Sequence, residues 1–212
     1  MTKGWGPLGW ATLHSISALY PDNPSEYEQE MFSRWLMSFT STILCPSCLQ
    51  HFTDTIAAYT LIRPDWKSSR RGVVEFVLRA HNSVNIRNRQ KVYTFQESMT
   101  ELAVFLPEHT ATAKRQEYLA YIRADWMRNM SMAGISNAPK LRELNIIEEN
   151  YWSKRSFKWS DLSVFSDVNV SPLADPTSTL TSGGTFIPRL TTPSAGFKFL
   201  KVGKIGPRLA LR

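Results

Sequence analysis

The sequence is poor in cysteine, because its 212 residues contain only Cys45 and Cys48. With no third thiol, this C-x-x-C pair either closes on itself as a disulfide or shares a metal. His51, one turn further on, makes the motif look like half a zinc site. A structural zinc needs four ligands, however, and the other three histidines form no pair at metal-binding spacing. We therefore expect redox chemistry and no metal, with a zinc-binding interaction domain as the weaker alternative.

Long hydrophobic runs are also missing. No stretch approaches the 18 or more uninterrupted apolar residues of a transmembrane helix. The first residues lack the hydrophobic core of a signal peptide. We expect a soluble protein that is neither secreted nor membrane-spanning and is made in a cytosol-like compartment. In such a compartment, a C-x-x-C is more often catalytic than structural.

Positive charge is unevenly distributed. The net charge is +7, and residues 153–212 hold nine Lys and Arg against three Asp, so they account for +6. The segment 171–207 is also rich in Pro, Ser, Thr and Gly, which is typical of disordered or extended chain. We expect residues 153–212 to be a basic, extended tail that docks onto a partner and is dispensable for chemistry. A protein partner is favoured over nucleic acid because the basic residues are spread out rather than clustered.

Hydrophobic periodicity predicts an all-α fold. Helices are expected over 7–20, from a cap at Ser25 to about residue 43, over 46–61, from about 69 to 85, and from a cap at Thr94 to before residue 107. The first four and the short fifth would form a five-helix bundle over residues 1–107. Two further helices, 115–132 with Gly134 as its stop and 139–152, would make up an additional part over residues 108–152.

The residues around the two cysteines favour a reactive pair. Pro46 suits the first position of a helix, which makes Cys45 the helix cap and places Cys48 in the first turn. The free N–H groups and positive dipole end of a helix stabilise a thiolate. The alternative is an inert disulfide, but so short a loop removes little entropy from the unfolded chain.

Planar and polar side chains recur on two of the predicted helices. These residues are Trp10, His14 and Tyr20 on the first helix and its end, and His81, Asn82 and Asn85 on the fourth. Each alone could be an ordinary satisfied core residue. Together with a dithiol, they suit a flat aromatic electron acceptor, such as an isoalloxazine ring and an adenine held between helices.

Four motifs in order resemble those of the Erv/ALR sulfhydryl oxidases, especially the viral branch. Residues 5–14 resemble the family's W-G-P-x-x-W-x-x-L-H, residues 18–21 its A-x-Y-P, residues 44–48 its active-site C-x-x-C, and residues 81–85 its H-N-x-V-N. The resemblance covers residues 4–106. It implies a helical FAD-binding domain, often a homodimer, that makes disulfides at the expense of oxygen.

The resemblance also implies roles for single residues. Cys48 would lie against the flavin and Cys45 would exchange with the substrate thiol. The residues that would hold FAD are Gly6, Trp10, His14, Tyr20, His81, Asn82 and Asn85. The family's basic position after H-N-x-V-N is altered here, because the segment is one residue longer and lacks its Gly. Arg87 and Lys91 are both candidates for the phosphate or adenine contact, and Tyr93 is a weaker one.

The resulting hypothesis is an FAD-dependent thiol oxidase that acts on protein thiols and yields peroxide. The alternative is a structural virion or assembly protein that keeps the oxidase fold with little or no activity. The viral resemblance implies that the protein is found in the host cytoplasm or the virion, as a homodimer or as part of a larger assembly held by residues 153–212.

Overall fold

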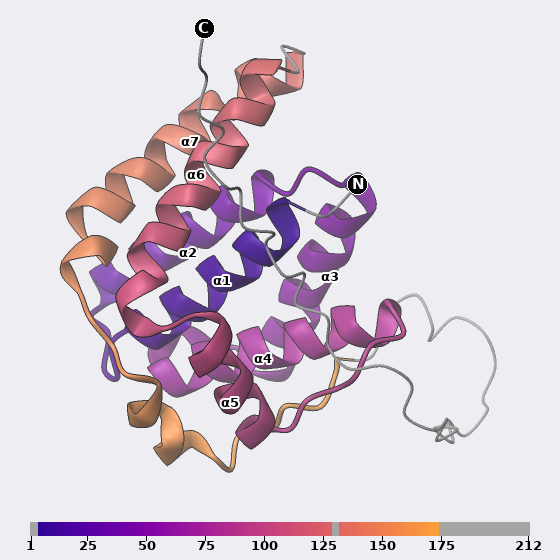
Figure 1. The fold of residues 1–212 in the computed structure, drawn as a ribbon, viewed down its shortest axis with the longest axis vertical. Coiled ribbons are helices and arrows are strands. Elements are labelled where there is room, and N and C mark those ends of the chain that lie inside the picture. Colours follow the sequence, from indigo (N-terminus) through magenta and orange to yellow (C-terminus); the bar gives the residue numbers. More distant parts are fainter. Residues whose placement is uncertain (1–3, 129–131, 174–212) are drawn as a thin grey trace, which may run out of the picture.

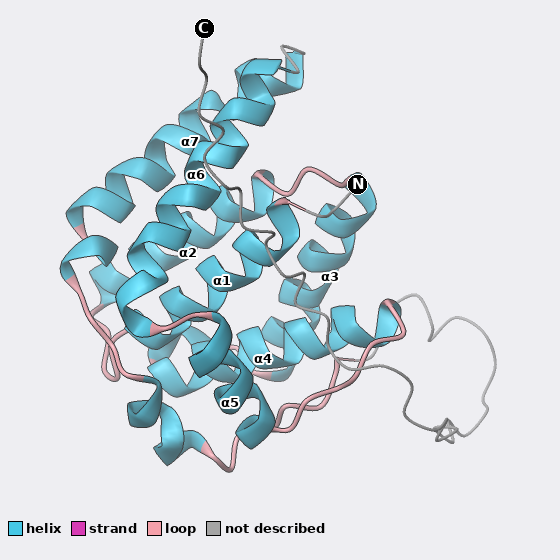
Figure 2. Ribbon diagram, viewed as in Figure 1, coloured by secondary structure: helices cyan, strands magenta, loops and turns pink. Residues whose placement is uncertain are grey.

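A computed structural model of the protein describes residues 4–128 and 132–173. These residues form helices and connecting segments without a strand, as Figure 2 shows, so the predicted all-α class is confirmed. The α-helices are α1 (Trp5–Leu19), α2 (Glu26–Ser41), α3 (Pro46–Ile62), α4 (Arg70–Arg87), α5 (Phe95–Phe105), α6 (Ala111–Arg128) and α7 (Met132–Asn150). Short 3-10 helices are η1 (Trp66–Ser68), η2 (Glu108–Thr110), η3 (Trp152–Lys154) and η4 (Trp159–Phe165). None of the described helices is long and apolar enough to cross a membrane.

Two helices begin with the predicted capping boxes. At α2, the Ser25 side chain accepts from the Glu28 N–H while the Glu28 carboxylate accepts from the Ser25 N–H. Thr94 and Glu97 make the same reciprocal pair at α5. Each box satisfies N–H groups that the first turn of a helix leaves without partners.

Helix α1 is central to the fold. It packs against α6 on one side and α4 on the other, while α2 packs against α7 and α3 (Figure 1). Tyr118 and Ile122 of α6 and Leu144 of α7 belong to the same buried cluster as Phe32 and Trp35 of α2. The expected boundary at residue 107 is therefore not a packing boundary, because one core continues across it.

The last two helices differ from their predicted bounds. Helix α6 ends at Arg128, and α7 (Met132–Asn150) includes both Gly134 and Pro139, which were expected to stop one helix and begin the next. Both residue types disfavour a helix interior. Packing of Leu141, Leu144 and Ile147 in the main core stabilises α7 in spite of them, as is usual when an apolar face is buried.

Residues 153–173 pack on the body of the protein and do not form the extended tail expected from residue 153. Trp159 and Leu162 of η4 are buried in a second apolar cluster with Leu102 and Leu106 of the α5 region. The Trp159 indole N–H donates to the Leu106 carbonyl at 2.8 Å. The Pro, Ser, Thr and Gly content that suggested an extended chain begins only after these apolar anchors. Residues 174–212 lie outside the described residues.

Gly72 permits a close crossing between η1 and α4. A Cβ atom at this position would overlap the carbonyl oxygen of Trp66, which is backbone and cannot move aside cheaply. Trp66 is buried against Phe76 of α4, with ring centroids 4.5 Å apart. Glycine therefore allows α4 to begin directly beside η1.

A buried ion pair ties the α6–α7 hairpin together. The Arg115 guanidinium of α6 donates to both carboxylate oxygens of Glu148 in α7 at 2.9–3.0 Å, and both side chains are almost fully buried. Arg115 also lies 3.4 Å from the Ser15 hydroxyl of α1 and donates to Thr112. Every nitrogen of the Arg115 guanidinium and both Glu148 carboxylate oxygens thus have a hydrogen-bond partner, as a buried charge pair requires.

Candidate active site

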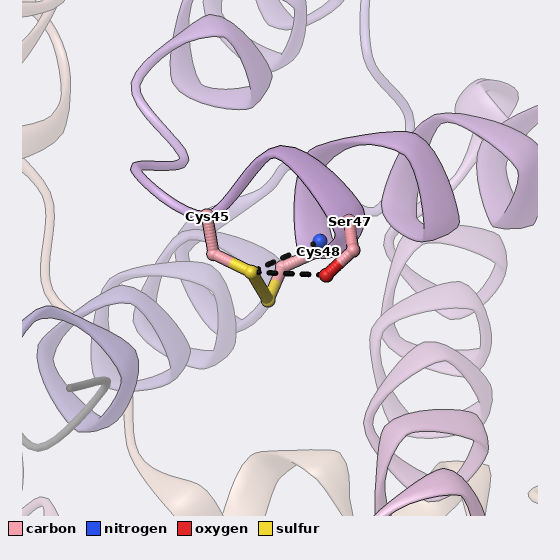
Figure 3. Close-up of a disulfide and its surroundings, with 3 residues drawn as sticks. All are labelled: Cys45, Ser47 and Cys48. Atoms are coloured by element: carbon pink, nitrogen blue, oxygen red, sulfur yellow. Dashed lines mark hydrogen bonds between the residues drawn. A yellow bond between two sulfur atoms is a disulfide. The ribbon is translucent and has the colours of Figure 1, made fainter.

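The two cysteines form a disulfide at the start of α3, as Figure 3 shows. Cys45 is the helix cap, Pro46 occupies the first turn, and the Cys48 N–H donates to the Cys45 sulfur at 3.3 Å. The predicted cap arrangement is therefore confirmed. The exposed Ser47 hydroxyl also lies 3.3 Å from the Cys45 sulfur. Both cysteines are half-buried, so a thiol from outside can reach the pair.

Phe52 connects the disulfide region to α1. It lies one helical turn beyond Cys48 on the same face of α3 and is buried. Its ring meets Trp10 edge-on, with centroids 6.4 Å apart and planes at 80°. Sequence reasoning missed Phe52, although its spacing of four residues from Cys48 was a usable signal.

Three predicted residues form one ring cluster: Trp10 and His14 of α1 and His81 of α4. Trp10 and His81 are stacked, with centroids 4.1 Å apart and planes within 11°. The His14 Nε2 lies 2.9 Å from the His81 Nδ1, so one nitrogen donates and the other accepts. The helical spacing predicted residues on inward faces, and the structure brings these three together.

Both imidazoles of the ring cluster are neutral at pH 7. Burial lowers the pKa of His14 well below its ordinary value, and the proximity of His81 lowers it further. Burial also lowers the pKa of His81, to about 4. The cluster therefore presents uncharged, flat surfaces.

A small cavity of about 20 Å³ adjoins the two histidines. It is lined by His14, Leu78, His81, Asn82, Asn85, Tyr93, Ser98, Glu101 and Leu102. Predicted residues from α1, α4 and the segment before α5 thus share one cavity. The α5 residues Ser98, Glu101 and Leu102 were not predicted, because the sequence did not indicate which face of α5 turns towards α4.

The Asn82 side-chain amide makes three hydrogen bonds to main-chain groups. Its Nδ2 donates to the Tyr93 carbonyl at 2.8 Å and the Val170 carbonyl at 2.7 Å, and its Oδ1 accepts from the Tyr93 N–H at 3.0 Å. Asn82 is almost fully buried. In the structure it therefore fixes the backbone at Tyr93, and its expected contact with a cofactor stays a prediction.

The two basic candidates differ in their surroundings. Lys91 donates to Glu97 at 2.8 Å and lies over the Tyr93 ring, 4.8 Å from its centroid. The Lys91 hydrogen bond is the main reason that the pKa of Glu97 falls to about 2. Arg87 lies exposed in the last turn of α4. Of the two cations, Lys91 already has an anionic neighbour.

Two other predicted residues occupy different settings. Tyr20 is fully buried away from the ring cluster, where its hydroxyl donates to the Lys67 carbonyl at 2.7 Å and its ring packs on Phe32. The structure thus does not bring Tyr20 to the cavity, because α1 ends one turn beyond His14 and turns Tyr20 towards α2. Gly6 has open space where a side chain would stand.

The fold and the site together define an all-helical protein with a C-x-x-C disulfide near a cluster of flat, uncharged rings. A family model described as the Erv1 / Alr family matches residues 8–104. The chain belongs to this family. No solved structure gives a significant match.

Similar proteins include three from viruses. A probable FAD-linked sulfhydryl oxidase of Acanthamoeba polyphaga mimivirus is 28% identical over 112 residues, covering 53% of this chain and 74% of that protein. A putative FAD-linked sulfhydryl oxidase of Invertebrate iridescent virus 3 is 35% identical over 85 residues, which cover 40% of this chain and 56% of that protein. Another putative FAD-linked sulfhydryl oxidase, of Invertebrate iridescent virus 6, is 30% identical over 86 residues, which cover 39% of this chain and 78% of that protein.

Proposed function

We propose that this protein is an FAD-dependent thiol oxidase that forms disulfides in protein substrates, with oxygen as electron acceptor and peroxide as product. The observation that carries the proposal is the continuity of the site. A half-buried disulfide at a helix start lies one turn from Phe52, Phe52 contacts Trp10, and Trp10 stacks on His81. Family membership and the naming of two viral relatives as FAD-linked sulfhydryl oxidases support the same activity.

The residues of the ring cluster fit a flavin cofactor. Trp10 and His81 stack on each other with centroids 4.1 Å apart, so a flavin ring would lie against the outer side of this pair rather than between the two rings, and the neutral histidines add hydrogen-bonding nitrogens without charge. The open space beside Gly6 leaves room for close approach of a ligand to the start of α1. Trp10, His14, His81 and Asn85 would therefore hold the cofactor. Bound there, FAD would supply the two-electron redox chemistry that links the dithiol to oxygen.

The chain's own chemistry is thiol–disulfide exchange. A substrate thiolate attacks the Cys45 sulfur, the Cys45–Cys48 bond breaks, and Cys48 leaves as a thiolate. The positive end of the α3 dipole stabilises that thiolate, while the Cys48 N–H donates to the Cys45 sulfur. A second substrate thiolate attacks the substrate sulfur of the mixed disulfide, which forms the substrate disulfide and releases Cys45. The two electrons removed from the substrate now reside on the Cys45–Cys48 dithiol.

The experiment is to purify the full chain, record its flavin absorbance and measure oxygen uptake with dithiothreitol. We expect a yellow protein whose oxygen uptake is lost in Cys48→Ala and kept in the matched control Ser47→Ala, which changes the exposed neighbour. Absence of both flavin and oxygen uptake in the parent protein would refute the proposal.

We further propose that residues 174–212 tether the enzyme to an acidic protein surface in a larger assembly, such as a virion. This segment carries six Lys and Arg against one Asp and no cysteine. Deletion after Leu173, rather than after Trp152, is the appropriate test, because residues 153–173 pack on the body of the protein. Oxygen uptake should persist in the shortened protein while recovery with the assembly is lost.

A further inference from the structure

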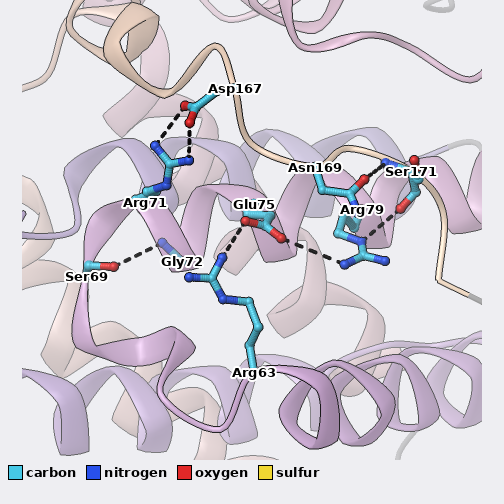
Figure 4. Close-up of polar contacts among 9 residues, drawn as sticks. All are labelled: Arg63, Ser69, Arg71, Gly72, Glu75, Arg79, Asp167, Asn169 and Ser171. Carbon is cyan, nitrogen blue, oxygen red and sulfur yellow. Dashed lines mark hydrogen bonds and ion pairs between the residues drawn. The ribbon is translucent and has the colours of Figure 1, made fainter.

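The final described segment, residues 167–173, runs along α4, and we refer to it as the C-terminal strap. Near the start of α4, Arg71 forms a two-pronged ion pair with Asp167, with donor–acceptor distances of 2.8 and 2.7 Å (Figure 4). Two turns later, the Arg79 Nε donates to the Ser171 carbonyl at 2.9 Å (Figure 4). The strap therefore follows α4 towards the ring cluster.

The most buried attachment of the strap lies beside His81, at Asn82 and Ser83. Asn82 donates to the Val170 carbonyl at 2.7 Å, and the Leu173 N–H donates to the Ser83 hydroxyl at 2.9 Å. Asn82, Ser83 and the Leu173 side chain are all buried. Because buried hydrogen-bonding groups are costly to leave unpaired, these contacts are coupled to the position of α4 at this point.

Asn82 joins the strap to the cavity. The same amide that donates to Val170 also donates to the Tyr93 carbonyl and accepts from the Tyr93 N–H. Tyr93 lines the cavity together with His14, His81 and Asn85. If the strap leaves, one Asn82 N–H loses its buried partner, and the amide keeps only its two hydrogen bonds to the Tyr93 main chain, which forms one wall of the cavity.

We infer that the C-terminal strap supports the cofactor site from outside the cavity, with Asn82 as the positioning residue through which it holds the Tyr93 wall of the cavity. The inference rests on the proposed function, since it concerns how firmly FAD is held. It implies that FAD binding and strap docking stabilise each other, because coupling between two sites is reciprocal.

The main test measures FAD affinity in two full-length variants that each add a carboxylate to residues 153–173. Leu173→Asp places the charge at a buried position, whereas Val164→Asp places it at an exposed one on η4. We expect the dissociation constant of FAD, measured by flavin fluorescence, to rise about tenfold in Leu173→Asp and to stay unchanged in Val164→Asp. Leu173→Ile, which keeps the buried apolar contact, should restore parental affinity.

Two readouts separate positioning from general damage. At saturating FAD, the oxygen-uptake kcat of Leu173→Asp should equal that of the parent, because the dithiol stands on α3, away from the strap. Hydrogen exchange in the peptide containing Leu173 should slow when FAD is added to the parent protein. Loss of kcat at saturating FAD, or exchange that FAD leaves unchanged, would contradict the positioning role.

A milder variant covers the case in which Leu173→Asp does not fold. Asp167→Asn removes the exposed ion pair with Arg71, and we expect FAD affinity to fall about threefold, with Asp161→Asn as the matched control. If Asp167→Asn, and Leu173→Asp where it folds, bind FAD as tightly as the parent protein, the inference about the strap is wrong while the proposed function still stands. A parent protein that binds no FAD overturns the proposed function as well.

Discussion

The disulfide stands at the start of a single helix, whereas the ring cluster and its cavity are assembled from four separated parts of the chain. Cys45 and Cys48 are positioned by one cap and one turn of α3. The cavity draws on α1, α4, α5 and the segment around Tyr93, with the strap behind Asn82. The reactive part is thus local in sequence, and the binding part depends on tertiary packing. Mutations should therefore separate chemistry from cofactor retention.

The largest expected effect is on turnover with the cofactor retained. Cys45→Ser and Cys48→Ser should each lower oxygen uptake by about a thousandfold or more, because neither can form the disulfide. FAD content should match the parent in both. If Cys48 is the cysteine nearest the flavin, Cys45→Ser should show a long-wavelength charge-transfer band and Cys48→Ser none. Bands in the opposite variants would reverse the two roles.

Asn82→Ala should have the opposite pattern, in which the protein loses FAD affinity and stability while the Cys45–Cys48 pair is unchanged. Truncation leaves the buried Tyr93 N–H without its partner, so the free energy of unfolding should fall by about 2–3 kcal/mol and FAD affinity with it. Denaturant unfolding and flavin fluorescence measure the two quantities. Asn88→Ala, at an exposed position one residue beyond α4, is the control. Unchanged FAD affinity in Asn82→Ala would show that the cavity does not depend on the Tyr93 wall.

Acid should destabilise the ring cluster. His81 has a folded-state pKa of about 4 against about 6.5 when unfolded, and the pKa of His14 is also lowered. Between these values the unfolded state binds more protons, so the free energy of unfolding falls as pH drops from 6.5 to 4, by up to about 3 kcal/mol from His81. Well above pH 6.5, His81 is neutral in both the folded and the unfolded state, so this loss of stability is absent.

Denaturant unfolding at several pH values measures this slope, which is the change in the free energy of unfolding with pH. His81→Phe, which keeps a flat ring, should make the free energy of unfolding depend less steeply on pH. Tyr93 and Glu101 face the same cavity as His81, and a slope that survives in His81→Phe would point to His14, whose pKa is also lowered.

The smallest effect is expected at the two basic candidates. Arg87→Ala should weaken FAD binding about threefold, and more at low salt, because an exposed cation near a phosphate is screened. Lys91→Ala should have less effect, since Lys91 is already paired with Glu97. Fluorescence titration at two salt concentrations measures both. A larger loss in Lys91→Ala would assign the phosphate contact to Lys91.

The sequence predicted the features that depend on neighbouring residues. The capping boxes at Ser25 and Thr94, and the cap at Cys45, each rest on side chains within one turn of the groups they satisfy. Helical spacing also predicted that Trp10 and His14 share a face, and four ordered motifs predicted the family.

Features that depend on distant packing could not be predicted. Nothing in the neighbourhood of Asn82 indicates that Val170, 88 residues away, accepts its hydrogen bond. The position of the Tyr20 hydroxyl depends on where η1 lies, because this hydroxyl donates its hydrogen bond to the carbonyl of Lys67 in η1. Trp159 and Leu162 were obscured by a composition dominated by the residues that follow them.

The buried pair of Arg115 and Glu148 bears on how the chain avoids wrong arrangements while it folds. Because apolar burial is non-directional, it alone does not fix the register in which α6 and α7 pack against α1 and α2. A hairpin displaced by one turn would bury a guanidinium or a carboxylate without its partner, which costs about 3–5 kcal/mol. We expect the pair to act mainly by penalising such misregistered states, so that replacing both residues with apolar ones would preserve stability while broadening the set of compact structures.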